Sequence, residues 1–111
     1  MKQALHHWRA QRITAVILVP LCLWFILTLA VMMNMDYASV TAWIKSPLTS
    51  LLLILFIFAL FEHAHLGLQV ILEDYIGSAG RRNCAIFMTR IAILGAGLIS
   101  ALSVLKITLR L

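Results

Sequence analysis

Three long apolar stretches divide the polar residues of this chain into short groups. The stretches cover about residues 13–33, 48–72 and 84–105. Each has roughly the ~20 apolar residues that, at ~1.5 Å per residue, cross the ~30 Å hydrocarbon core of a bilayer. The pattern therefore predicts an all-α membrane protein with three transmembrane helices, folded as a single membrane domain over residues 1–111.

The residues between and within these stretches predict how the helices begin, bend and end. Pro47 suits the first turn of the second helix. Pro20 lies inside the first helix, where it removes a backbone donor and is expected to bend the chain. The connector 34–47 carries Trp43, which is expected to anchor at the membrane interface. Glycines and paired arginines over residues 77–83 predict a turn before the third helix.

Composition strengthens the membrane assignment. Hydrophobic residues make up 63% of the chain and charged residues 12%, with a mean hydropathy of +1.02. Soluble domains average about 45–50% apolar and about 25% charged, so a water-soluble fold is excluded, and the length leaves no room for an external catalytic domain. The net charge of +5 comes from basic residues that flank the apolar stretches, which indicates topology signals and lipid headgroup contacts rather than nucleic-acid binding.

The basic residues also predict the orientation of the chain. The three predicted spans place two groups of basic residues on opposite sides of the membrane. One side has Lys2, Arg9, Arg12, Arg81, Arg82 and Arg90, and the other has Lys45, Lys106 and Arg110. The positive-inside bias places the N-terminus and the turn at 77–83 in the cytoplasm, and the C-terminus outside. Arg90 lies inside the third stretch and is expected to snorkel back toward Arg81 and Arg82. The N-terminus lacks a signal cleavage site and a long presequence, which favours a multi-pass protein of the bacterial inner membrane with its first span retained.

The second stretch contains ionisable residues at mid-depth, namely Glu62, His63 and His65. Such groups are costly in lipid and usually face a protein interior, a cofactor or a water path. At ~100° per residue, His63 shares a face with Gly67, whereas His65 points roughly 200° away from His63. The two histidines therefore cannot bind one metal from the same face. Glu62 and His65 are one turn apart, which predicts a hydrogen bond between them.

His63 has two interpretations. The small neighbours Ala64 and Gly67 leave space beside it for a flat macrocycle or a quinone. A haem iron takes an imidazole as axial ligand, and this chain would need a partner protein for the second ligand. A lone intramembrane histidine is also commonly a hydrogen-bonded contact between helices. The residues alone leave both interpretations open.

Asp74 and Tyr75 lie ~16 to 18 Å along the helix from His63, at ~1.5 Å per residue. That distance places them at the predicted cytoplasmic interface. A phenol there can donate a hydrogen bond to a quinone carbonyl, and a carboxylate can relay protons from water. Tyr75 can equally belong to the aromatic belt of the membrane, with Asp74 as a helix-end charge. Taken alone, the residues favour the second interpretation.

Together these segments resemble the small hydrophobic membrane anchor of succinate dehydrogenase, a cytochrome b-type component of complex II. The family carries a His-Ala-x-x-Gly segment, a Gln-Val/Leu stretch and an Asp-Tyr pair on its second helix. Here they stand as His63–Gly67, Gln69-Val70 and Asp74-Tyr75. Residues 12–15, Arg-Ile-Thr-Ala, resemble the family's Arg-x-Thr-Ala at the start of the first span, and residues 8–12 resemble its bacterial forms.

The resemblance implies roles for particular residues. His63 would be the axial ligand that this chain gives to the iron of haem b, with the other imidazole coming from the companion cytochrome b anchor. Tyr75 would donate a hydrogen bond to a ubiquinone carbonyl, with Asp74 beside it on the proton-entry side. Arg12 would lie near the haem propionates or the quinone pocket. His65 falls outside the family pattern and stays an alternative ligand.

The resemblance also implies partners and a reaction. The chain would not be catalytic alone. It would anchor a flavoprotein and an iron–sulfur protein to the membrane beside the cytochrome b anchor, and electrons would pass from the iron–sulfur protein to ubiquinone, linking the tricarboxylic acid cycle to the respiratory chain. A fumarate reductase anchor has a similar architecture and works in the opposite direction with a different quinone, so the sequence does not separate the two.

A small holin-like pore is the alternative from another class of protein. It would also be short, multi-spanning and basic at its ends. Such a pore would not need Glu62, His63 and His65 at mid-depth, nor a tyrosine at the end of the helix.

Overall fold

A computed structural model describes residues 2–110 of the chain, with side chains described from residue 5. The side chain of Lys2, which entered the charge comparison, lies outside the described part. The elements in order are the helices α1 (Lys2–Met32), α2 (Tyr37–Lys45), α3 (Pro47–Tyr75) and α4 (Ala79–Thr108), and residues 2–110 form no strand.

Three of the helices are long and apolar enough to cross a membrane. The spans are Leu5–Met32 within α1, Pro47–Tyr75 and Ala79–Thr108. They confirm the prediction of an all-α membrane protein with three transmembrane helices. Each begins before the bound expected from the apolar pattern, because polar residues at a helix end still complete its hydrogen-bonded turns.

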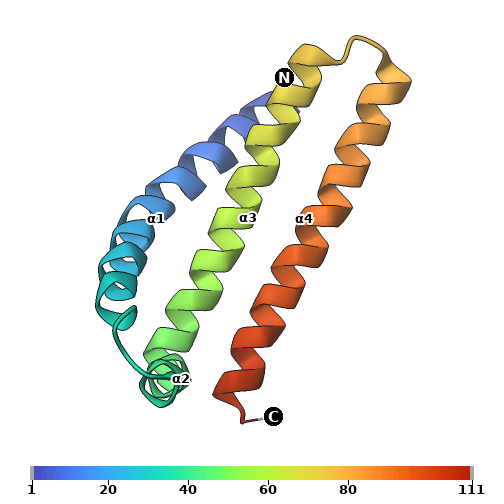
Figure 1. The fold of residues 1–111 in the computed structure, drawn as a ribbon. Coiled ribbons are helices and arrows are strands. Elements are labelled where there is room, and N and C mark those ends of the chain that lie inside the picture. Colours follow the sequence, from blue (N-terminus) through green and yellow to red (C-terminus); the bar gives the residue numbers. More distant parts are fainter. Residues whose placement is uncertain (1, 111) are drawn as a thin grey trace.

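The three spanning helices lie side by side, with α3 between α1 and α4 (Figure 1). The short α2 crosses one end of the bundle and packs against α3 and α4. The N-terminus lies at the same end as the α3–α4 connection, and the C-terminus lies at the end that carries α2 (Figure 1). The molecule is elongated, with principal extents of 51 × 27 × 23 Å.

The core lies between α1 and α3. Leu18 and Leu21 of α1 meet Phe56 and Ala59 of α3, and Phe25 stacks on the Phe56 ring with 4.9 Å between centroids. Ala59 keeps only 2% of its surface exposed, so the two backbones approach closely there. Small residues at such contacts favour packing between transmembrane helices, where dispersion replaces the hydrophobic effect as the main attraction.

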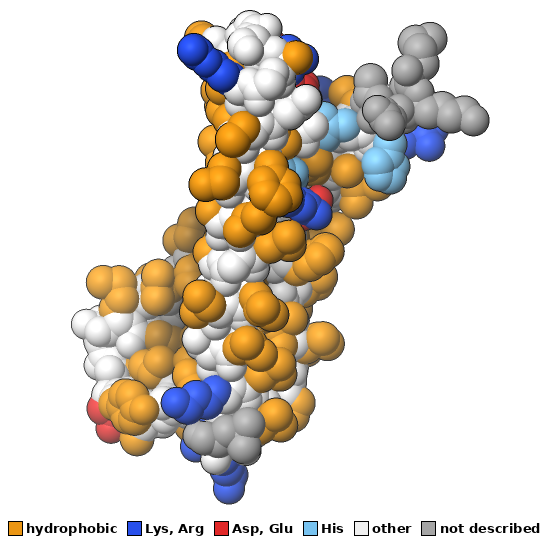
Figure 2. All heavy atoms as spheres, turned by 90° about the vertical axis from the view of Figure 1, so that its right-hand side faces the viewer, with side chains coloured by type: hydrophobic (Ala, Val, Ile, Leu, Met, Phe, Trp, Pro, Cys, Tyr) orange, Lys and Arg blue, Asp and Glu red, His pale blue; other side chains and the backbone are white. Residues whose placement is uncertain are grey.

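Apolar side chains cover most of the outer surface. Figure 2 shows hydrophobic side chains spread over the face that it displays, with Lys and Arg gathered mainly toward its two ends. None of the described residues of α4 is buried. An exposed apolar surface this extensive is the surface expected of a chain covered by lipid or by partner helices.

The connector 34–47 is largely helical, which the sequence did not predict. Asp36 caps α2, its carboxylate accepting a hydrogen bond of 3.0 Å from the Ser39 backbone N–H. Hydrogen bonding from Ser39 also holds the pKa of Asp36 below its usual value. Trp43 of α2 packs against Trp24 of α1, with ring centroids 6.0 Å apart. The role of Trp43 as an interface anchor stays a prediction.

The turn predicted over residues 77–83 is shorter than expected. Only residues 76–78 are non-helical, and Ser78 is the N-cap of α4, so Gly80 and both arginines lie in the first turns of that helix. None of the described glycines has a positive φ, and arginine is a good helix former, so these residues suit a helix start. The glycines of residues 77–83 therefore did not predict the length of the turn.

Pro20 lies within α1 without ending it. Figure 1 shows α1 changing direction about halfway along its length, as a proline inside a helix predicts.

Candidate functional site

His63 on α3 faces α1. Its Nδ1 lies 3.0 Å from Oγ1 of the buried Thr14. The Thr14 hydroxyl also lies within hydrogen-bond distance of two backbone carbonyls of its own helix, at 2.9 Å from Ala10 and 3.0 Å from Gln11. The hydroxyl has a single proton, and these carbonyls can only accept it. When the hydroxyl donates this proton to a carbonyl, Thr14 Oγ1 accepts a hydrogen bond from His63, and this arrangement places the ring proton on Nδ1 and leaves the Nε2 lone pair free.

A small hollow of about 240 Å³ opens beside the imidazole. Four residues of α1 line it with His63, namely Trp8, Gln11, Arg12 and Ala15. The Arg12 guanidinium lies over the Trp8 ring, 5.4 Å from its centroid, an arrangement of cation and aromatic face that holds the charge in place. The structure thus brings together two of the predicted site residues, His63 and Arg12, from different helices.

The residues around His63 fit an iron porphyrin. A metal-ligating histidine usually donates its second ring N–H to a nearby acceptor, which fixes the tautomer and the ring orientation. His63 makes that contact through Thr14. The charge of Arg12 at the rim suits carboxylate groups such as the propionates of a haem. The donor set therefore matches the group expected from the sequence.

Thr14 is the site residue that sequence reasoning missed. Thr14 belongs to the Arg-x-Thr-Ala segment, but its position in that segment did not predict a contact with His63. Predicting this contact requires the relative rotation of α1 and α3, because that rotation determines which residue of α1 contacts His63.

His65 lies on another side of α3. It is 6% exposed and lines a hollow of about 330 Å³ with residues of α4, among them Asn83 and Arg90. The separation of the two histidines confirms the prediction from helical phase. Among the described residues, no hydrogen-bond partner meets His65 Nδ1.

Glu62 pairs with Arg90 rather than with His65. Arg90 Nη1 lies 3.1 Å from Glu62 Oε2, across the α3–α4 contact. The predicted Glu62–His65 hydrogen bond is therefore wrong, because a charge-assisted bond to a guanidinium is stronger than one to a neutral imidazole. Arg90 is thus engaged by Glu62, and its expected snorkelling toward Arg81 and Arg82 stays a prediction. Each charge of the pair offsets the other within the span.

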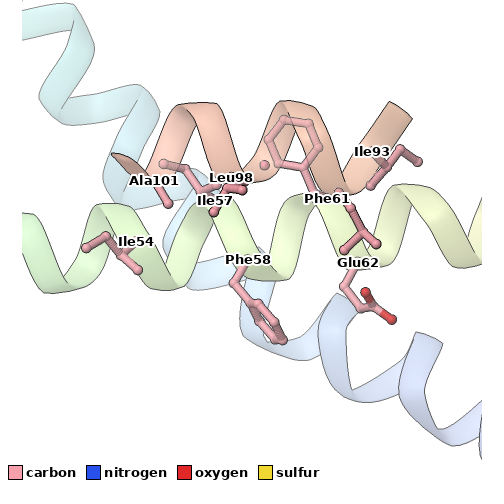
Figure 3. Close-up of a pocket in the computed structure, with 10 residues that line it drawn as sticks. Ile54, Ile57, Phe58, Phe61, Glu62, Ile93, Leu98 and Ala101 are labelled. Carbon is pink, nitrogen blue, oxygen red and sulfur yellow. The ribbon is translucent and has the colours of Figure 1, made fainter. Parts of the chain in front are cut away.

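An apolar groove of about 270 Å³ runs between α3 and α4 (Figure 3). Figure 3 shows Glu62 toward one end of it, the end at which Ile93 also lies. Gly97 lies against the Phe61 ring, where an added Cβ would stand 3.7 Å from the nearest ring atom. Helices α3 and α4 thus come into contact at Gly97, whereas a Cβ at Gly95 would meet no atom within 4 Å.

Asp74 and Tyr75 are the last two residues of α3, and both side chains are exposed, Tyr75 to 84%. Because α3 is continuous from His63, its rise of ~1.5 Å per residue separates His63 and Tyr75 by ~18 Å. This is the end of the bundle that also holds the first turns of α1 and the start of α4 (Figure 1). Among the described residues, no side-chain hydrogen bond involves Tyr75, and the nearest one along α3 joins Gln69 to Glu73.

Comparison with known proteins gives a consistent result. The family model of the succinate dehydrogenase/fumarate reductase transmembrane subunit matches residues 1–104. A protein of Rickettsia bellii is 36% identical over 90 residues, which cover 81% of this chain and 72% of the relative. One of Rickettsia conorii is 32% identical over 91 residues, with the same coverage of both chains. Both relatives carry the name succinate dehydrogenase hydrophobic membrane anchor subunit.

Proposed function

Since the chain belongs to the family of succinate dehydrogenase/fumarate reductase transmembrane subunits, we propose that it is the hydrophobic anchor of a succinate dehydrogenase and shares haem b with a second anchor chain. The observation that carries the proposal is the His63 imidazole, which contacts Thr14 through Nδ1 and lines a hollow together with Arg12. The names of the relatives favour succinate oxidation over the fumarate reductase alternative. Family membership leaves the holin-like alternative without support.

His63 and Arg12 would hold the haem from this side. Nε2 of His63 would be the ligand that this chain gives to the haem iron, and a second imidazole would come from the companion cytochrome b anchor. Haem b, when bound, supplies one-electron redox chemistry. Arg12, which lines the same hollow, would pair with a propionate.

Tyr75 and Asp74 would form this chain's share of the ubiquinone site. The Tyr75 hydroxyl donates a hydrogen bond to a quinone carbonyl, and the Asp74 carboxylate delivers protons from the aqueous side. Both side chains are exposed at the end of α3, within reach of a quinone and of the iron–sulfur protein. Electrons enter from that protein, which receives them from the flavoprotein. We place this end in the cytoplasm and the complex in the bacterial inner membrane, following the charge asymmetry.

The assembly itself can be tested directly. A tagged copy of the chain, extracted from its own membranes in mild detergent, is expected to co-purify with a flavoprotein, an iron–sulfur protein and a second haem-binding anchor. Mass spectrometry of the purified material identifies these chains. Recovery of the chain only as a homo-oligomer would contradict the proposal.

Thr14 would act as a positioning residue for His63. A hydrogen bond from Nδ1–H makes the imidazole a more basic ligand, which favours the oxidised iron. Loss of a hydrogen bond worth about 1 kcal/mol corresponds to about 40 mV for a one-electron couple. We therefore expect Thr14→Val to raise the midpoint potential of haem b by about that amount in a potentiometric titration.

Thr14→Ser provides the matched control, because serine keeps the hydroxyl and loses only a methyl group. It is expected to keep the wild-type potential. Equal potentials for Thr14→Val and the wild type would show that the contact does not act on the ligand.

A further inference from the structure

The end of the bundle opposite the His63 site holds a basic cavity. It has a volume of about 560 Å³ and lies between α2 and the last turns of α4. Its lining includes Lys45, Lys106 and Arg110, which are the three basic residues that the sequence places at this end, together with the hydroxyl residues Tyr37, Thr41 and Ser103. Helices α2 and α4, which are far apart in the sequence, thus place all three of these basic residues around one cavity.

A buried hydrogen-bond junction fixes the two walls of the cavity. Ser50, at the start of α3, is 5% exposed. Its hydroxyl donates to the backbone carbonyl of Ile44 in α2 and lies 2.6 Å from the Thr108 hydroxyl in α4. Ile44 precedes Lys45, and Thr108 is half a turn beyond Lys106. The junction therefore fixes the backbone positions that carry Lys45 and Lys106 relative to each other.

Among the described residues, the lining of the cavity has three basic side chains and no carboxylate. Over residues 5–110, the ion pair present is that of Glu62 and Arg90, which lies away from this cavity. The carboxylate nearest in sequence, Asp36, is engaged in capping α2. A ligand that satisfies several Lys and Arg donors at once needs negative charge and more than one acceptor oxygen, which a phosphate group provides.

Two hydroxyl groups in the lining also favour an anionic ligand. Thr41 donates its proton to backbone carbonyls of α2, and Ser103 donates to the Ile99 carbonyl of α4. Both can then only accept at the cavity. The donors that face a ligand are thus mainly cationic groups, which suits an anion rather than a neutral polar molecule.

The position of the cavity indicates the source of the phosphate. It opens where α3 begins and α4 ends, so it lies at headgroup level for helices that span the bilayer. Figure 1 shows α2 nearly end-on while α3 and α4 run along the page, so α2 crosses the bundle as a helix at the membrane surface would. On the orientation predicted from the charges, this is the outer side, where the positive-inside bias disfavours Lys and Arg. A bound lipid headgroup accounts for their presence there.

We propose that this cavity binds the phosphate group of an anionic phospholipid through Lys45, Lys106 and Arg110. Its volume lies within the range of about 300–1,000 Å³ that is usual for ligand sites. Basic pockets between transmembrane helices bind anionic lipid headgroups on the cytoplasmic side of membranes, and this cavity offers the same kind of donors on the opposite side. The inference concerns a different end of the molecule from the His63 site and does not depend on the proposed electron-transfer function.

Native mass spectrometry of the full chain, released from nanodiscs of phosphatidylcholine with added phosphatidylglycerol, tests the proposal. The wild type is expected to retain phosphatidylglycerol in preference to phosphatidylcholine. Each basic residue near a membrane surface contributes about a fivefold gain in affinity for anionic lipid. The triple variant Lys45→Gln, Lys106→Gln, Arg110→Gln is therefore expected to bind phosphatidylglycerol on the order of 100-fold more weakly.

The matched control removes the same charge from the other end, through Arg9→Gln, Arg81→Gln and Arg82→Gln. It is expected to keep the tightly bound lipid. The charge-preserving variant Lys45→Arg, Lys106→Arg is also expected to keep it, and circular dichroism checks that all variants stay helical. Neutralising the cavity strengthens the positive-inside bias, so membrane insertion is not impaired.

Three results would overturn the proposal. The first is equal retention of phosphatidylglycerol by the wild type and the cavity variant, and the second is equal retention of the two lipids by the wild type. The third is binding of millimolar inorganic phosphate at the cavity, measured by ³¹P NMR, without retention of the lipid, since that result would assign the cavity to a soluble anion.

Discussion

Replacing His63 by alanine is expected to abolish the haem b absorption band of the purified complex. His63 is the one imidazole among the described residues that line the hollow, and its Nδ1 contacts Thr14, so no other side chain of the hollow can take over its role as a nitrogen ligand. Histidine coordination holds haem in proteins of this electron-transfer type, and a single remaining ligand from the partner anchor would leave the iron with an open position. Reduced-minus-oxidised difference spectra measure the loss.

His65→Ala is the matched control for this prediction. His65 lies two residues after His63 on the same helix, at the contact with α4. It lines a different hollow from the one beside His63. Its replacement is expected to leave the haem spectrum unchanged, although it alters packing beside Arg90. The opposite outcome, with the band lost in His65→Ala and kept in His63→Ala, would reverse the assignment of the ligand.

The number and type of the spanning helices followed from the sequence because lipid imposes a simple rule. A chain crossing the bilayer must satisfy its backbone groups internally, so each apolar stretch of sufficient length becomes a helix. The same rule says nothing about segments at the surface. Helix α2 was missed for that reason, since its formation depends on the Asp36 cap and on packing against α3 and α4.

The site was predictable where it depended on one helix and unpredictable where it depended on two. Helical phase alone separated His63 from His65, as the structure confirms. The partners of these residues come from other helices, and the rotation of α1 and α4 about their own axes leaves little trace in a single sequence. Hence Thr14 was not identified, and Glu62 was paired with a neighbour on its own helix instead of with Arg90.

The basic residues illustrate the same limit. Counting them by side gave an orientation, and the count needed only their order in the sequence. Their gathering around one cavity needed the Ser50 junction, in which a side chain of α3 holds α2 and α4 together. The sequence therefore showed the charge asymmetry between the two membrane sides, whereas the basic cavity could be recognised only in the structure.

Tyr75→Phe is expected to slow quinone reduction by about 10-fold or more while succinate oxidation with an artificial acceptor keeps its wild-type rate. Phenylalanine keeps the ring and removes only the hydroxyl, so the variant tests the hydrogen bond to the quinone carbonyl. A hydrogen bond that gains strength as charge develops on the carbonyl oxygen is worth about 1.5–3 kcal/mol, or about 10- to 150-fold in rate. Because Tyr75 is 84% exposed, its hydroxyl supports no described contact within the chain, and stability should be unaffected.

Tyr37→Phe is the matched control, because Tyr37 has the same exposure of 84% and lies at the opposite end of the bundle. It is expected to leave both activities unchanged. The two assays separate the steps, since the artificial acceptor takes electrons before the quinone site. Equal loss of both activities in Tyr75→Phe would assign Tyr75 to the structure of the complex, and no loss of either would place the quinone elsewhere, since the hydroxyl at the end of α3 would then have no part in its reduction.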